Sequence, residues 1–141
     1  MSKTIMLIAA AVLGSLFASA PARAADDAKT ERFFELRKYT APEGKLDALQ
    51  ARFRDHTNTL FRKHGMEIIG FWVPTDEKQG AKNTLIYILA YPSKEAREAS
   101  WKAFQADPEW KAAKAESEKN GPLTTKVEST YMKPTDYSPM K

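Results

Sequence analysis

The sequence has no cysteine among its 141 residues, and this absence excludes disulfide bonds, thiolate metal sites and cysteine nucleophiles together. Lys and Arg form no stripe interleaved with aromatic residues, so nucleic-acid binding is not expected. The sequence also lacks a serine nucleophile motif, a Gly-rich phosphate loop and a clustered set of carboxylates. A domain of this kind depends on its hydrophobic core for stability, and we predict that it uses no metal and no cofactor.

The first 24 residues have the three regions of a secretory signal peptide. Lys3 gives the positive start, residues 5–17 are apolar, and Ala22 and Ala24 supply the small residues of a cleavage site. The apolar run is shorter than the roughly 20 residues that a helix needs to span a bilayer, so no stable membrane anchor is expected. We predict cleavage after Ala24 by the general secretory route and a periplasmic or secreted protein.

Removal of the signal peptide leaves 117 residues, enough for one domain that buries about two-thirds of its unfolded surface. The signal peptide contains two of the 22 basic residues and none of the 18 acidic ones, so the mature net charge is only +2. Charge therefore says little about partners. We expect a polar leader over residues 25–31, the domain over residues 32–132, and a loose tail over residues 133–141.

Hydrophobic periodicity predicts four strands and three helices. The first helix carries an apolar stripe of Leu46, Leu49, Phe53 and Leu60, and Gly65 is a typical helix stop. The order β-α-β-β-α-β is that of a ferredoxin-like α+β fold, with a four-stranded antiparallel sheet and both main helices on one face. The expected strands are residues 32–39, 67–73, 84–91 and 125–132, and the expected helices are residues 45–63, 94–106 and 108–119.

The third expected strand, residues 84–91, is a continuous apolar run with no polar alternation. Such a run is typical of a strand that is covered on both faces. The helices can cover one face, but so short a chain has nothing left to cover the other. We therefore expect a homodimer.

Residues 101–110 place three large aromatic side chains around a break between two helices. Asp107 can accept hydrogen bonds from the first turn of a new helix, and Pro108 at its first position loses no bond. Trp110 then lies one turn after the break, close enough to reach back over Phe104. We interpret Trp101, Phe104 and Trp110 as packing anchors rather than catalytic groups.

Five short motifs stand out by their order and spacing: residues 35–39 (ELRKY), the His64-Gly65 turn, and residues 70–72 (GFW), 87–91 (YILAY) and 101–110 (WKAFQADPEW). Together they resemble the NIPSNAP family over roughly residues 33–132. This resemblance implies a ferredoxin-like protomer that pairs sheet to sheet into a dimeric α/β barrel, as in related cofactor-free monooxygenases. It does not define an activity, since the family has no common reaction.

Strand alternation places Glu35, Arg37 and Tyr39 on one face and Phe34 and Leu36 on the other. If Phe34 and Leu36 meet the helices, the polar trio points into the lumen of the barrel. An acid, a guanidinium and a phenol in a partly apolar chamber can orient a small ligand.

Trp72 and Tyr87 are candidate aromatic walls of that chamber. The alternative is purely structural: a Glu35–Arg37 salt bridge at the dimer interface, with Tyr39 at its rim.

The two histidines are weak candidates for chemistry. His56 and His64 are eight residues apart on one helix, roughly 12 Å along its axis, which is too far for a paired metal site. His64 fits a helix C-terminus, where a cation is favoured, and His56 fits the boundary of the apolar stripe.

Two classes of function remain. The first is a homodimeric protein that binds a small hydrophobic ligand, or an accessory protein, without a reaction. The second is a cofactor-independent monooxygenase or cyclase that acts on an aromatic or enolisable substrate. Such an enzyme needs an acid-base group in the lumen, and because the histidines belong to the helix side, the first class is favoured. A structural homodimer with a filled barrel is the third alternative.

Overall fold

The computed structural model describes residues 32–141. The predicted signal peptide and polar leader lie outside the described residues. In chain order the elements are β1 (Phe33–Thr40), α1 (Leu46–Arg52), the π-helix η1 (Phe53–Thr57), α2 (Asn58–Lys63), β2 (Glu67–Trp72), the 3₁₀ turn η2 (Glu77–Gln79), β3 (Thr84–Tyr91), α3 (Lys94–Ala106), α4 (Pro108–Ser117) and β4 (Lys126–Met132).

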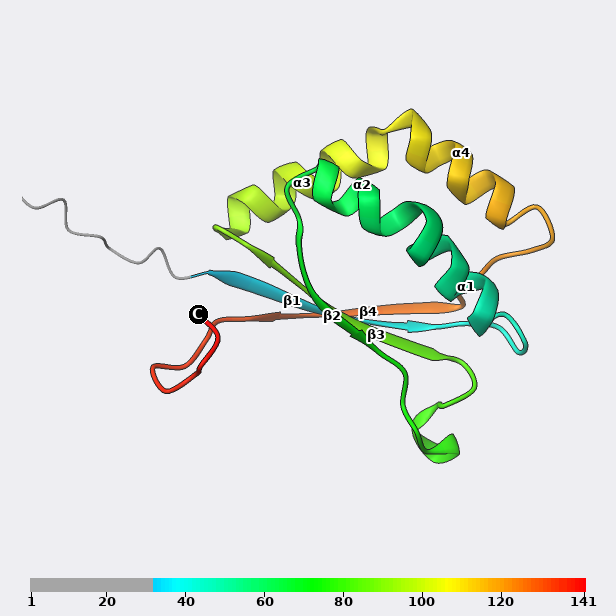
Figure 1. Ribbon diagram of the computed structural model, residues 1–141, viewed down its shortest axis with the longest axis horizontal. Coiled ribbons are helices and arrows are strands. Elements are labelled where there is room, and N and C mark those ends of the chain that lie inside the picture. Colours follow the sequence, from blue (N-terminus) through cyan, green and yellow to red (C-terminus); the bar gives the residue numbers. More distant parts are fainter. Residues whose placement is uncertain (1–31) are drawn as a thin grey trace, which may run out of the picture.

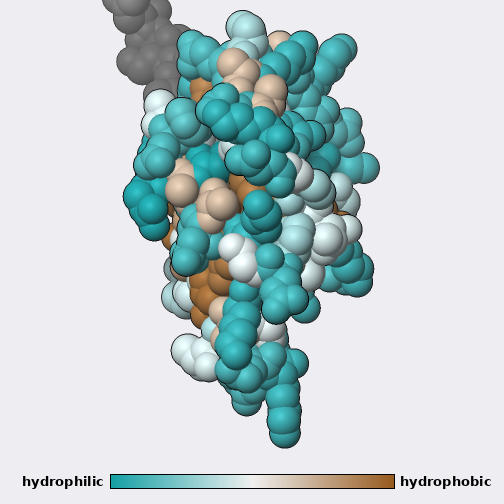
Figure 2. Space-filling model, turned by 90° about the vertical axis from the view of Figure 1, so that its right-hand side faces the viewer, coloured by the Kyte–Doolittle hydropathy of each residue, from teal (hydrophilic) through white to brown (hydrophobic). Residues whose placement is uncertain are grey.

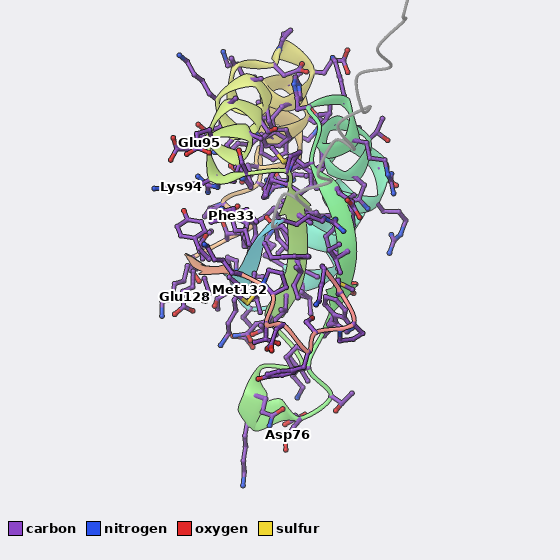
Figure 3. All side chains as sticks on the ribbon, turned by 90° about the vertical axis from the view of Figure 1, so that its left-hand side faces the viewer. Phe33, Asp76, Lys94, Glu95, Glu128 and Met132 are labelled. Atoms are coloured by element: carbon purple, nitrogen blue, oxygen red, sulfur yellow. The ribbon has the colours of Figure 1, made fainter. Side chains whose placement is uncertain are left out.

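The four strands form one antiparallel sheet in the order β2-β3-β1-β4. All four α-helices lie on one face of this sheet, and the hairpin between β2 and β3 projects beyond the other face (Figure 1). Asp76 lies at the far tip of that hairpin, well away from Lys94 and Glu95 at the start of α3 (Figure 3). The predicted ferredoxin-like α+β fold is confirmed.

The first helix keeps its predicted apolar stripe but not a regular geometry. Leu49, Phe53 and Leu60 are buried against the sheet, as expected. Between α1 and α2, however, the helix widens into a π turn in which the N–H of Asn58 bonds to the carbonyl of Phe53. The hydroxyl of Thr57 donates to the carbonyl of Arg52 at 3.2 Å and helps to satisfy the widened turn. Gly65 then ends the helix at φ 75°, a conformation that favours glycine.

The predicted starts of the last two helices, and the break between them, are confirmed. Ser93 caps α3 by accepting a hydrogen bond from the N–H of Ala96 at 3.1 Å. Asp107 caps α4 by accepting one from the N–H of Glu109 at 2.8 Å, and Pro108 occupies the first helical position. The chain between the two helices is extended at Asp107, so α4 leaves α3 at an angle (Figure 1).

The hydrophobic core fills the space between the sheet and the helices. Aromatic rings dominate it: Phe61 packs against Phe104 at 5.0 Å and against Trp101 at 5.6 Å between ring centroids. Phe53 packs on Tyr87 of the central strand β3 at 5.2 Å. The remaining buried members include Leu46, Leu49, Leu60, Met66, Leu85, Leu89, Tyr91 and Leu123.

The opposite face of the sheet is apolar at its centre, and no helix within residues 32–141 lies over it. Ile86 and Ile88 of β3 are half-buried there, and Trp72 is 49% exposed with its ring lying over Gly70, where a Cβ atom would clash at 2.7 Å. Figure 2 shows apolar side chains exposed below the level of the helices, among hydrophilic ones. We call the face of the sheet that lies opposite the helices, and that carries Trp72, Ile86 and Ile88, the open face.

The C-terminal tail lies beside the open face. Its residues line a hollow of about 290 Å³ together with Phe34 and Ile88. The carbonyl of Lys141 accepts a hydrogen bond from Arg32 at 3.2 Å, whereas Tyr137 is 83% exposed. Over residues 32–141 no helix is long and apolar enough to cross a membrane.

Candidate ligand-binding site

The carboxylate of Glu35 is the centre of a buried polar cluster beneath α3. Its side chain is fully buried. Arg97 donates to it twice, from Nε at 2.9 Å and from Nη2 at 2.8 Å, and Arg37 donates from Nη1 at 2.8 Å. The hydroxyl of Tyr91 (3.2 Å) and the indole N–H of Trp101 (3.0 Å) complete the set of donors. Every lone-pair direction of this carboxylate is therefore in use.

This environment keeps Glu35 ionised. Burial raises the pKa of Glu35, but the hydrogen bonds and positive charges of Arg97 and Arg37 outweigh burial, so the pKa lies below its ordinary value. Burial also raises the pKa of Tyr91, which stays a neutral donor. A carboxylate that is ionised and fully hydrogen-bonded is a structural anchor and is poorly suited to accept a proton from a substrate.

A second chain of hydrogen bonds runs from Arg37 to two tyrosines. Arg37 Nη2 donates to the hydroxyl of Tyr39 at 3.1 Å, and the hydroxyl of Tyr87 donates to the same oxygen at 2.9 Å. The Tyr39 oxygen thus accepts two hydrogen bonds, which leaves its own proton available to a third group. The guanidinium of Arg37 also stacks over the ring of Trp101 at 4.3 Å.

A cavity of about 530 Å³ lies next to this cluster, between the sheet and the helices. Its wall combines aromatic rings with cationic side chains from six elements: β1, α1, η1, α2, α3 and α4. Those that define its chemistry are Arg37, Tyr39, Arg52, Phe53, Trp101, Phe104, Trp110, Lys111, Lys114 and Glu118.

The site therefore lies within a single chain, on the face of the sheet that the helices cover. The prediction that Glu35, Arg37 and Tyr39 share a face is confirmed, but that face meets the helices, and Phe34 lies on the open face. The predicted Glu35–Arg37 salt bridge exists, at 2.8 Å, but it is buried under α3 within the chain.

The two predicted aromatic walls are not brought together. Trp72 is paired with Ile86 and lies on the open face, while Tyr87 points toward the helices and is completely buried under Phe53 and Phe71. Neither residue lines the cavity.

The motif at residues 101–110 forms one wall of the cavity. Trp110 packs on Phe104 at 4.5 Å between ring centroids, as predicted, but it is only half-buried, and its ring also faces the cavity. Packing and ligand contact are therefore compatible roles for the three aromatic residues of this motif.

Asp107 joins the end of the first helix to the start of α4. Its Oδ2 accepts from His64 Nε2 at 2.7 Å and from Lys63 at 2.9 Å. The hydrogen bonds of Lys63 and then of His64 hold the pKa of Asp107 well below its ordinary value. His64 is thus a structural partner of this junction, and His56 is exposed. No cluster of potential metal ligands is found in the part of the chain that the structure describes.

Sequence reasoning missed Arg52 and Arg97, the two arginines that complete the site. Arg97 precedes Trp101 by one helical turn, so the two side chains lie on the same side of α3. Arg52 flanks the apolar stripe of the first helix and is buried at 6% exposure. A charged residue beside an apolar stripe was the available signal for Arg52.

Comparison with known structures shows the same fold. A NIPSNAP family protein of unknown function from Agrobacterium tumefaciens superposes with a TM-score of 0.68 at 24% identity, over 79% of this chain and 96% of that one. A NIPSNAP-like domain protein from Burkholderia xenovorans gives 0.68 at 19% identity, over 78% and 90%. A monooxygenase from Streptomyces coelicolor, solved with nanaomycin D, gives 0.55 at 12% identity, over 78% and 93%. No curated protein matches the chain.

Fold and site together define a ferredoxin-like α+β protein with a cavity between its sheet and its helices. The NIPSNAP family model matches residues 34–139, which is most of the described chain. The protein belongs to the NIPSNAP family.

Proposed function

We propose that this protein binds a small aromatic molecule in the cavity between the sheet and the helices. The cavity itself is the observation that carries the proposal. Its volume of about 530 Å³ falls within the roughly 300–1,000 Å³ that is usual for small-molecule sites. The rings of Phe53, Trp101, Phe104 and Trp110 form apolar walls against which a flat ligand can pack.

The binding function requires no reaction. Glu35 is the nearest carboxylate to Arg37 and Tyr39, and its lowered pKa and full set of donors argue against an acid-base role. His56 and His64 do not line the cavity. These features favour a binding protein over an enzyme.

Native mass spectrometry of the protein purified from its own host tests the proposal. We expect one small molecule bound per chain. Ala115 lines the cavity, so Ala115→Trp should fill its mouth and abolish the adduct. Ala112→Trp places the same ring on the exposed side of α4, away from the cavity, and should keep it. A ligand-free parent protein, or an adduct that survives Ala115→Trp, contradicts the proposal.

The second candidate is a cofactor-independent monooxygenase. One observation favours it: the Tyr39 hydroxyl lines the cavity and has a proton free to donate to a substrate oxygen. The fold it shares with the Streptomyces coelicolor monooxygenase is compatible with this alternative. Oxygen uptake in the presence of an oxidisable phenol, lost in Tyr39→Phe, would favour the enzyme.

The predicted export and pairing remain part of the proposal. The signal-peptide pattern of residues 1–24 supports export with cleavage after Ala24. The apolar open face supports a homodimer that pairs sheet to sheet, since none of the helices in residues 32–141 covers it. The mass of the exported form tests both features.

A further inference from the structure

Positive charge is in surplus around the cavity. The lining includes four cations, Arg37, Arg52, Lys111 and Lys114, but a single carboxylate, Glu118. Glu118 is already paired with Arg52 at 2.7 Å. The nearby Glu35 does not offset the surplus, because Arg37 shares it with Arg97. Cations held in a partly desolvated site favour the entry of an anion.

Unused hydrogen-bond donors in the same place strengthen this argument. The side chain of Arg52 is only 4% exposed, and its Nη1 donates to Glu118 and to Ser117. Its Nε is buried and has no partner among residues 32–141, and the same holds for Nε of Arg37. A buried charged donor without an acceptor is costly, so a ligand that supplies the acceptor gains that free energy on binding.

The cations lie directly against the aromatic walls. The guanidinium of Arg52 is 5.3 Å from the ring of Trp110, and that of Arg37 is 4.3 Å from the ring of Trp101. A guanidinium presents its N–H groups as a planar fork that matches a carboxylate. The cavity therefore combines aromatic walls with carboxylate-matching guanidinium groups that stack on two of those rings.

We infer that the ligand is an aromatic carboxylate, with its ring between the aromatic walls and its carboxylate held by Arg52 and Arg37. Nε and Nη2 form one edge of the Arg52 guanidinium, and this edge can meet the carboxylate while Nη1 keeps its contact with Glu118. Lys111 and Lys114 on α4 add positive charge at the entrance. This inference rests on the proposed function and adds the chemical class of the ligand.

Calorimetric titration with two probes of the same shape tests the inference. 2-Naphthoate carries a carboxylate, and 2-naphthamide is its neutral counterpart. We expect the parent protein to bind 2-naphthoate about tenfold tighter or more, since each hydrogen bond to a charged group is worth a comparable factor. Arg52→Gln should reduce this preference severalfold, because it removes one of the two arginines that hold the carboxylate. Arg62→Gln, which removes the same charge from an exposed position on α2, should keep the preference.

A second variant shifts the affinity in the opposite direction. Glu118→Gln removes the anion that competes for Arg52 and should tighten binding of 2-naphthoate but not of 2-naphthamide. This variant retains Arg52, so it decides the question even if Arg52→Gln fails to fold. Equal affinity for both probes in the parent protein, or an undiminished preference in Arg52→Gln, would overturn the inference and leave the proposed function standing. Binding of neither probe would overturn both.

Discussion

At the scale of single residues, the most constrained side chain is Glu35. Two arginines, a tyrosine and a tryptophan all donate to one carboxylate beneath α3. Breaking such a buried cluster is costly because the remaining charges lose their partner, even where the whole cluster contributes little net stability. Glu35 therefore fixes how α3 lies on the sheet and where Arg37 and Trp101 meet the cavity.

We predict that Glu35→Gln lowers the free energy of unfolding at pH 7 by about 3 to 5 kcal/mol, since it leaves Arg37 and Arg97 without a counter-charge. The folded-state pKa of Glu35 lies below its ordinary value of 4.5, so its contribution is present above pH 4.5 and is lost as the pH falls through the folded value. Urea melts of both proteins between pH 7 and pH 3 measure this. The deficit of the variant should shrink on acidification. A deficit that stays constant would mean that the charge of Glu35 is not what stabilises the fold.

At the scale of elements, the junction of α3 and α4 combines a helix break, a cap and a cavity wall. Asp107 holds the break by hydrogen bonds to the N–H of Glu109, to Lys63 and to His64. Trp110, one turn later, packs back on Phe104. Because these contacts are separate, stability and ligand binding can be separated by mutation here.

Trp110→Ala should lower the free energy of unfolding by about 2 to 3 kcal/mol, less than the roughly 3 to 5 kcal/mol of a fully buried ring. It should also weaken binding of an aromatic ligand, because the ring lines the cavity.

Asp107→Ala should destabilise the fold but leave ligand affinity nearly unchanged. Its deficit should be present above pH 3.8 and fade as the pH falls, since the pKa of Asp107 is lowered in the folded protein. Denaturant melts and titrations of both variants measure these effects. Unchanged ligand affinity in Trp110→Ala would show that the ring only packs.

Most elements could be predicted because the chain marks their ends with specific residues. Ser93, Asp107-Pro108 and Gly65 each dictate a local conformation, and the structure has a helix boundary at each. The site could not be predicted in the same way. Alternation in β1 gives two faces that both carry aromatic or apolar residues, so the sequence does not say which one the helices cover.

The remaining features of the site depend on contacts that are distant in sequence. Arg97 and Glu35 are 62 positions apart, and only the packing of α3 on the sheet brings them together. The π turn at residues 53–57 has no residue such as proline or glycine to announce it. The burial of Arg52 follows from its contacts with Trp110 and Ser117 of α4, and the periodicity of one helix carries no information on these.

At the scale of the whole molecule, the two faces of the sheet have different roles. The face under the helices holds the core and the cavity, while the open face exposes a patch that includes Trp72, Ile86 and Ile88. Separation of this kind would let two copies pair through the open faces without disturbing either cavity.

Native mass spectrometry of the exported protein should give twice the mass of a chain that begins at Ala25. Ile86→Lys places a charge at the centre of the open face and should yield one copy of the same chain, because a desolvated unpaired charge is costly at an interface. Thr59→Lys adds the same charge to an exposed position on α2 and should remain paired. A parent protein with the mass of one chain at micromolar concentration would refute the dimer, and a mass that includes residues 1–24 would refute cleavage.

The π turn has a consequence for how the binding site can evolve. A π turn contains one residue more than an α turn, so the first helix carries a surplus residue beside the cavity. Deletion of one exposed residue there, such as Arg54, would restore a regular helix. The widened turn already takes up the extra residue, so the helical segments before and after it would keep their orientation on the sheet. Only side chains within the turn, such as Phe53 and Thr57 on the cavity wall, would change position. A single deletion can thus reshape one wall of the cavity without moving the rest of the helix, and binding profiles of relatives with and without the extra residue would test this.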